Sequence, residues 1–135
     1  MDNLEKQFSA LKVLVVDDMD AIRNLVSSTL KELGVRTILQ APNGSVAWSH
    51  IQGAPVDMIV CDWDMPQVSG LELLELVRKS EKYNHIPFLM LTGSTEKSKV
   101  MNAVVAGVSD FLSKPFSPKD LEYRVIKLMR TVKSD

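Results

Sequence analysis

The sequence predicts an α/β fold, a doubly wound five-stranded parallel sheet of the (βα)5 type. Stretches rich in aliphatic residues alternate five times with stretches of helical periodicity. Two of the aliphatic runs, Val13–Val16 and Met58–Cys61, are apolar throughout, as in strands that are buried on both faces. The 135 residues suffice for one domain and are too few for an eight-stranded barrel.

The first strand is predicted at Lys12–Val16. Apolar residues then recur at helical spacing from Ile22 to Leu33, and Gly34 supplies a C-terminal stop for this first long helix. Residues 1–11 form a short extension that precedes the strand. In this extension three apolar residues fall at helical spacing, which suggests a short helix: Leu4, Phe8 and Leu11.

The second unit is shorter than the first. A strand is predicted at Thr37–Ala41 and ends at the turn Pro42–Gly44. Ser45–Gln52 is predicted to be a helix closed by Gly53.

The third unit begins with the second fully apolar run. A strand at Met58–Asp62 leads into the loop Trp63–Gly70, in which proline and glycine interrupt regular structure. A helix follows at Leu71–Lys79. The fourth strand is predicted at Pro87–Leu91, with proline at its first position, where a missing backbone donor costs least.

The last two helices enclose a short strand. The first of them is predicted at Thr95–Ala106, and the strand at Asp110–Ser113. The last helix has a clear start, with Ser117 as N-cap and Pro118 at the first helical position. Five apolar residues form its predicted buried stripe: Leu121, Val125, Leu128, Met129 and Val132.

Composition excludes several classes of protein. A formal charge of −1 and a pI near 6.1 give no electrostatic case for nucleic acid or an anionic membrane as partner. The single cysteine, Cys61, lies in a strand and is interpreted as core. His50 and His85 are isolated from each other, so no transition-metal site is expected. No apolar stretch approaches the roughly 20 residues that span a bilayer, and the acidic N-terminus is unlike a signal peptide, so we expect a cytoplasmic protein.

Two of the predicted strands end in carboxylates. Asp17 and Asp18 follow the first strand, and Asp62 ends the third. If these strands are adjacent and parallel, the three carboxylates meet within about 5 Å, where each pair of charges costs roughly 3 kcal/mol. Such a cluster requires a cation, a raised pKa, or both. Because all donors are oxygen, Mg²⁺ is favoured over zinc.

Two further polar residues follow strands four and five. Thr92 comes after the fourth strand and Lys114 after the fifth. The turn after the first strand lacks the glycines of a nucleotide or flavin site. A carboxylate nucleophile, a metal, a hydroxyl and an ammonium group suit phosphoryl transfer onto an aspartate.

The ordered set of motifs resembles the response-regulator receiver domains, and among them the single-domain chemotaxis receivers. The resemblance covers nearly the whole chain, with residues 12–135 as the receiver domain. It implies a flavodoxin-like fold with strand order 2-1-3-4-5, an order taken from known folds of this class. The matching segments are Val13–Asp18, Lys31–Gly34, Asp62–Pro66, Gly70–Leu74, Leu91–Thr92 and Lys114–Phe116.

The resemblance implies a role for each site residue. Asp62 would accept a phosphoryl group from the phosphohistidine of a histidine kinase. Asp17, Asp18, Asp62 and the backbone carbonyl of Asp64 would bind Mg²⁺, with Asp17 acting mostly through water. In such proteins the bond equivalent to Lys114–Pro115 is usually cis.

The resemblance also implies a switch. Thr92 and Lys114 would contact the phosphoryl group, and Phe111 takes the place of the aromatic residue that turns inward. The readout surface would be formed by the predicted helix at Thr95–Ala106, the strand at Asp110–Ser113 and the last helix.

Three positions depart from the chemotaxis receivers. Phe111 stands where they carry tyrosine, Asp64 where they carry asparagine, and Ser94 where they carry glutamate. The resemblance implies that the positions of Asp64 and Ser94 tune the lifetime of the phosphoaspartate and the engagement of auxiliary phosphatases.

Several alternatives are carried forward. The output target implied by resemblance is a flagellar motor switch, while a phosphorelay intermediate or a phosphate sink would have a similar sequence. A phosphatase resembling the haloacid dehalogenases would share the spelling Asp62-Trp63-Asp64, but Met65-Pro66 does not fit and a cap insertion is lacking. A receiver that has lost phosphorylation and acts as a scaffold is disfavoured, because all five site residues are present. We expect a monomer that is not a classical enzyme.

Overall fold

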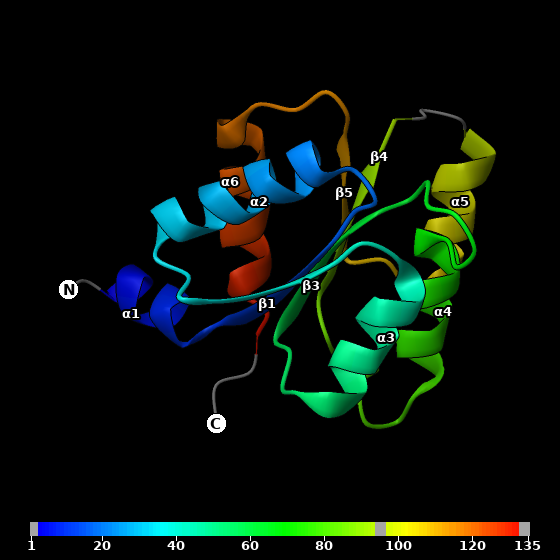
Figure 1. Cartoon of the computed structure of the whole chain (residues 1–135), viewed down its shortest axis with the longest axis horizontal. Coiled ribbons are helices and arrows are strands. Elements are labelled where there is room, and N and C mark those ends of the chain that lie inside the picture. The colour runs from blue at the N-terminus through cyan, green and yellow to red at the C-terminus, as the bar shows by residue number, and fades with distance from the viewer. Residues whose placement is uncertain (1–2, 94–96, 133–135) are drawn as a thin grey trace.

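The computed structural model describes residues 3–93 and 97–132, and in this part of the chain five parallel strands form one sheet of order β2-β1-β3-β4-β5. Both the fold class and the strand order are confirmed (Figure 1). The strands are β1 (Lys12–Val16), β2 (Thr37–Ala41), β3 (Met58–Asp62), β4 (Phe88–Thr92) and β5 (Asp110–Ser113). The helices are α1 (Asn3–Ala10), α2 (Asp20–Leu33), α3 (Gly44–Gly53), α4 (Gly70–Lys79), α5 (Lys97–Ala106) and α6 (Pro118–Met129).

Helices cover both faces of the sheet. Helices α1, α2 and α6 lie on one face, and α3, α4 and α5 lie on the other (Figure 1). Side chains of the central strands alternate between the two cores: Val13 and Val15 pack toward α2 and α6, whereas Leu14 and Val16 pack toward α3 and α4. Because the central strands are buried on both faces, their sequences are apolar without alternation.

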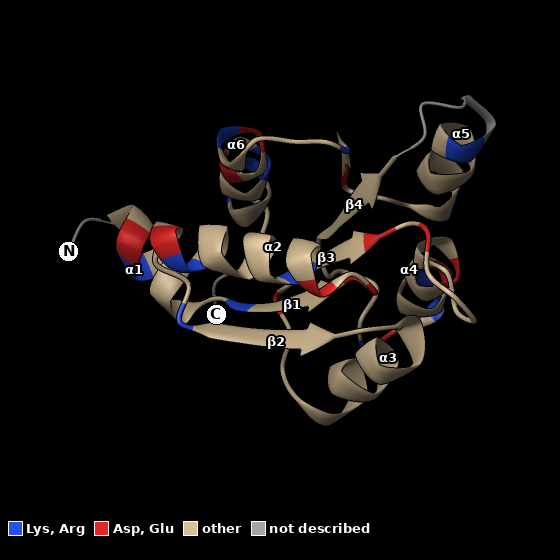
Figure 2. Cartoon of the chain, turned by 45° about the horizontal axis from the view of Figure 1, so that its top comes forward, with Lys and Arg blue, Asp and Glu red and all other residues tan. Residues whose placement is uncertain are grey.

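Strand register aligns the carboxyl ends of the central strands. Val16 of β1 pairs with Cys61 of β3, and Asp62 pairs with Leu91 of β4. Figure 2 shows acidic residues at the ends of β1 and β3, on the same edge of the sheet. This edge holds the side chains that the sequence singled out.

Local signals set the helix boundaries. Gly34 ends α2 with a φ of 109°, a left-handed conformation that costs glycine little. Helices α4 and α6 each begin with a capping box, formed by Ser69 with Glu72 and by Ser117 with Asp120. The predicted start of the last helix is therefore confirmed.

Some predicted boundaries were wrong. Strand β4 begins at Phe88, because Pro87 contributes only its carbonyl, which accepts a hydrogen bond from the Ile59 amide. Gly53 is the last residue of α3 and does not stop it, since the chain leaves at Ala54 in an extended conformation. Val132 lies beyond the end of α6 and is only partly buried.

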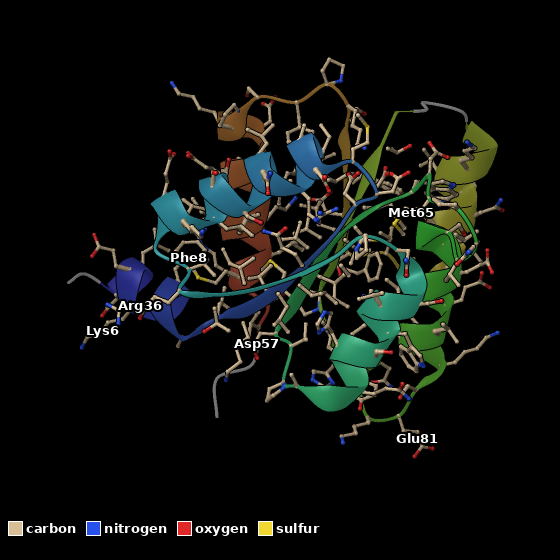
Figure 3. All side chains as sticks on the ribbon, in the orientation of Figure 1. Lys6, Phe8, Arg36, Asp57, Met65 and Glu81 are labelled. Carbon is tan, nitrogen blue, oxygen red and sulfur yellow. The ribbon has the colours of Figure 1, made fainter. Side chains whose placement is uncertain are left out.

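Helix α1 packs onto the face formed by α2 and α6. Its Phe8 is fully buried in that core, and Figure 3 shows its position beside α2. Leu4 remains 37% exposed. Among the described residues, no helix is both long and apolar enough to cross a membrane.

Candidate functional site

Three carboxylates converge at the carboxyl ends of β1 and β3. One ligand oxygen from each of Asp17, Asp18 and Asp62 lies within 4.8 Å of the others. Asp17 and Asp62 are buried, whereas Asp18 is exposed. The register of β1 against β3 causes this convergence, since the residues that follow Val16 and Cys61 must lie side by side.

Lys114 joins the two buried carboxylates. Its Nζ donates to Asp62 Oδ1 at 2.9 Å and to Asp17 Oδ2 at 3.3 Å. The loop after β5 places it there: the Lys114 amide donates to the Thr92 carbonyl at 2.8 Å, and the Lys114–Pro115 bond is cis, as the resemblance predicts. The side chain of Lys114 is 21% exposed, so this ammonium group is largely shielded from solvent.

Burial and the contact between Lys114 and Asp62 shift the pKa values of these two groups in opposite directions. Burial raises the pKa of the Asp62 carboxyl above its ordinary value of 3.8 more strongly than the hydrogen bond from Lys114 lowers it, and the charge of Asp17 raises it further. For Lys114, burial alone would lower the pKa, but its hydrogen bond to Asp62 and the charges of Asp62 and Asp17 raise it above 10.5. The site therefore favours a cation beside Asp62.

Asp17 is held by its backbone as well as by its side chain. Its amide donates to the Ala41 carbonyl at 3.2 Å, its carbonyl accepts from Arg23 Nη1 at 2.8 Å, and its Oδ1 accepts from the Met19 amide at 2.9 Å. Sequence reasoning missed both Arg23 and Met19. The spacing of Arg23 three residues after Asp20 is a helical ion-pair signal that could have indicated the arginine.

The other predicted site residues have varied positions. Thr92 is the last residue of β4 and is 4% exposed, one residue beyond the Leu91 that pairs with Asp62. Phe111 on β5 is partly buried and packs toward α3, α4 and α5. Ser94, predicted to tune the lifetime of the phosphorylated state, lies outside the described residues.

Asp64 follows Asp62 by two residues and faces solvent. Its side chain is 64% exposed and forms an ion pair of 3.7 Å with Lys99 of α5. Sequence reasoning did not predict this contact, which links the loop after β3 to α5. An exposed pair of this kind contributes little stability.

Two buried neighbours of Asp62 are part of the core. Trp63 is 8% exposed and Cys61 is fully buried, both packed toward α3 and α4. Burial, reinforced by the charges of Asp62 and Asp17, raises the pKa of the Cys61 thiol well above 9.0. Cys61 is therefore an unreactive core residue, as predicted.

Gly70 permits the loop after β3 to return beside the site. A Cβ atom at Gly70 would lie 2.4 Å from the Asp62 carbonyl oxygen and 2.9 Å from Trp63 Cα, and both of these atoms belong to the backbone. The Gly70 amide also donates to the Trp63 carbonyl at 3.0 Å. The sequence indicated Gly70 as a breaker at the end of this loop and as the first residue of a segment that resembles the receiver domains, without a reason for glycine there.

Gly70→Ala is therefore expected to lower the free energy of unfolding by about 3 kcal/mol, because the added methyl group must displace the backbone of Asp62. Urea denaturation measures the effect. The matched control is Gly53→Ala, whose Cβ would meet no atom within 4 Å and which should be neutral or slightly stabilising. Equal stability of the two variants would contradict the prediction.

The donor set fits a hard divalent cation. The three carboxylates offer oxygen ligands within one ion's reach, and the described residues place no histidine or thiol ligand with them. Lys114 already neutralises part of the charge, and the exposed Asp18 is left to offer a carboxylate oxygen to an ion. The same arrangement suits an oxygen nucleophile at Asp62, flanked by a cation site and an ammonium group.

Comparison with known proteins agrees with this geometry. The family described as response regulator receiver domain matches residues 13–126. Chemotaxis protein CheY1 of Helicobacter pylori is 34% identical over 122 residues, which cover 90% of this chain and 98% of that protein. A CheY homologue of Campylobacter jejuni is 36% identical over 122 residues, with coverage of 90% and 94%. The structure of the chemotaxis response regulator CheY4 of Vibrio cholerae has a TM-score of 0.82 at 36% identity, covering 87% of this chain and 98% of that one.

Proposed function

The chain belongs to the response regulator receiver domain family, and from this membership we propose that it signals by Mg²⁺-dependent phosphorylation of Asp62. It is a CheY-like receiver of chemotaxis or two-component signalling, and receivers are signalling proteins rather than classical enzymes. The observation that carries the proposal is the pairing of Lys114 Nζ with Asp62 Oδ1 inside a cluster of three carboxylates. The receiver domain would span residues 12–135, with residues 1–11 as an extension.

The phosphoryl group would come from the phosphohistidine of a histidine kinase. A carboxylate oxygen of Asp62 attacks phosphorus, the N–P bond breaks, and the imidazole that leaves takes a proton. The metal, held by Asp17, Asp18, Asp62 and the Asp64 carbonyl, would neutralise charge on the transferred oxygens. Lys114 would pair with a phosphoryl oxygen, and Thr92 would donate its hydroxyl to another.

The signal would leave through the face formed by α5, β5 and α6. Phe111 on β5 would turn inward as Thr92 moves toward the phosphoryl group. Three apolar side chains of α5 are more than half exposed, which supports a protein partner: Met101, Val104 and Val105. We propose a flagellar motor switch as that partner. The alternative is that the protein itself serves as a phosphorelay intermediate or as a phosphate sink.

Asp64 and Ser94 would set the phosphoryl lifetime, with or without an auxiliary phosphatase. The pairing of Asp64 with Lys99 gives Asp64 a contact near the acceptor. Pull-down with phosphorylated and with unphosphorylated protein distinguishes a motor regulator from a phosphate sink. A motor regulator should recover a target when it is phosphorylated, whereas a phosphate sink should recover none.

Intact mass spectrometry tests the phosphorylation itself. Incubation with Mg²⁺ and acetyl phosphate is expected to add the mass of one phosphoryl group to the protein. Chelation of Mg²⁺ should prevent the addition. Steady release of phosphate from unrelated phosphomonoesters with no lasting adduct would favour a phosphatase, and no reaction at all would favour a scaffold.

A further inference from the structure

Arg23 of α2 reaches back to the turn that carries two of the three clustered carboxylates. Its Nη1 donates to the Asp17 carbonyl at 2.8 Å and its Nε donates to Gln40 Oε1 of β2 at 3.0 Å. Its Nη2 bonds Asp20 Oδ1. With its side chain only 15% exposed, the guanidinium group is set between α2 and the edge of the sheet.

Each contact constrains a different direction of the guanidinium plane. Gln40 is itself oriented, because its Nε2 donates to Ser27 Oγ at 3.0 Å. The guanidinium group of Arg23 is thus held by Gln40 of β2 and by Asp20 in the first turn of α2, and its Nη1 points at the carbonyl of Asp17. A planar group with donors in fixed directions can do this, whereas a lysine ammonium group cannot make all three contacts.

We propose that Arg23 is a positioning residue that fixes the peptide between Asp17 and Asp18 and so pre-sets both carboxylates for a divalent cation. The inference rests on the proposed Mg²⁺-dependent function. The Asp17 amide donates to the Ala41 carbonyl, and the Met19 amide donates to Asp17 Oδ1. The carbonyl is therefore the other backbone group through which Asp17 can be held in place. Outer contacts of this kind orient metal ligands and typically change metal affinity by about tenfold or more when they are removed.

The charge of Arg23 and its hydrogen bonds predict opposite effects on Mg²⁺ affinity when Arg23 is removed. A guanidinium charge near the cluster repels a cation, so its removal alone would strengthen binding. The ion pair with Asp20 offsets much of that charge. Loss of the carbonyl contact frees the Asp17–Asp18 peptide and weakens binding, and we expect this geometric effect to dominate.

Two substitutions separate these effects. Arg23→Lys retains the charge and loses the fork, and Arg23→Met loses both. Mg²⁺ affinity is measured on the whole unphosphorylated protein by titration calorimetry with MgCl2, and folding by urea denaturation in a chelator. Arg36→Met removes an exposed arginine remote from the site and serves as the control.

Both Arg23 variants are expected to bind Mg²⁺ roughly tenfold more weakly than wild type, while Arg36→Met binds normally. Gln40→Leu should weaken binding in wild type and have no further effect in Arg23→Met, because Gln40 acts through Arg23. Tighter binding by Arg23→Met, or lower stability with unchanged affinity, overturns the proposal. Absence of Mg²⁺ binding by the wild type would contradict the proposed function. Equal Mg²⁺ binding by the wild type and all the variants would contradict only the role of Arg23.

Discussion

Asp62→Asn is expected to take up no phosphoryl group from acetyl phosphate and to be more stable than the wild type when Mg²⁺ is absent. The first effect is complete, because the amide oxygen is not a nucleophile that can form a lasting acyl phosphate. The second follows from the balance at the site. Burial of the Asp62 carboxylate, together with repulsion from Asp17, outweighs its hydrogen bond with Lys114.

The difference in stability between wild type and Asp62→Asn should depend on pH. Since the pKa of Asp62 is raised in the folded protein, its favourable contribution is complete below 3.8 and is lost as pH rises through the raised value. Wild type and Asp62→Asn should thus be similar in acid and diverge toward neutral pH, where the variant is the more stable of the two. Urea denaturation at a series of pH values in a chelator measures the difference.

Asp57→Asn is the matched control. Asp57 lies at the opposite end of β3 from the cluster, and Figure 3 shows it far from Met65 in the loop that follows β3. Its Oδ2 accepts a hydrogen bond from the Lys12 amide, which an asparagine oxygen can also accept. Phosphorylation of this control should be normal. A phosphoryl adduct on Asp62→Asn would remove Asp62 as the acceptor.

Lys114→Met is expected to destabilise the metal-free protein by about 3 kcal/mol at pH 7. The substitution keeps most of the apolar stem and leaves Asp17 and Asp62 facing each other without a cation, and breaking a buried pair in this way is costly. The loss should shrink in acid, as Asp62 is protonated. At the alkaline end, the raised pKa of Lys114 means that its stabilising contribution is still complete at 10.5 and is lost as pH rises through the higher folded value.

Mg²⁺ should restore part of the stability of Lys114→Met, because a divalent cation at the cluster replaces the missing ammonium charge. The variant is also expected to accept a phosphoryl group slowly and to fail to transmit it to a partner. Urea denaturation with and without MgCl2 checks the first result, and pull-down of the target with the phosphorylated variant checks the second. Lys31→Met, an exposed lysine of α2, is the control. Normal partner binding by phosphorylated Lys114→Met would exclude Lys114 from the switch.

The convergence of three carboxylates could be predicted because it depends on few long-range facts. Asp17, Asp18 and Asp62 follow apolar runs that are strands by composition, and parallel strands place such residues at one edge. Adjacency of β1 and β3 was the remaining requirement, and the strand order confirms it. The boundary of β4 was harder to predict, since the pairing of the Pro87 carbonyl with Ile59 has no signature in the sequence near Pro87.

The sequence by itself determined the order of strands and helices and the chemistry at the strand ends, because periodicity, caps and strand-end residues are local properties of the chain. Only the tertiary structure decided that Arg23 holds the Asp17 carbonyl, that Lys99 pairs with Asp64, and that Gly70 has no room for a methyl group. These contacts depend on how helices are oriented against strand ends and on which backbone groups remain unpaired there. Such geometry is fixed by packing of the whole core and cannot be read from neighbouring residues.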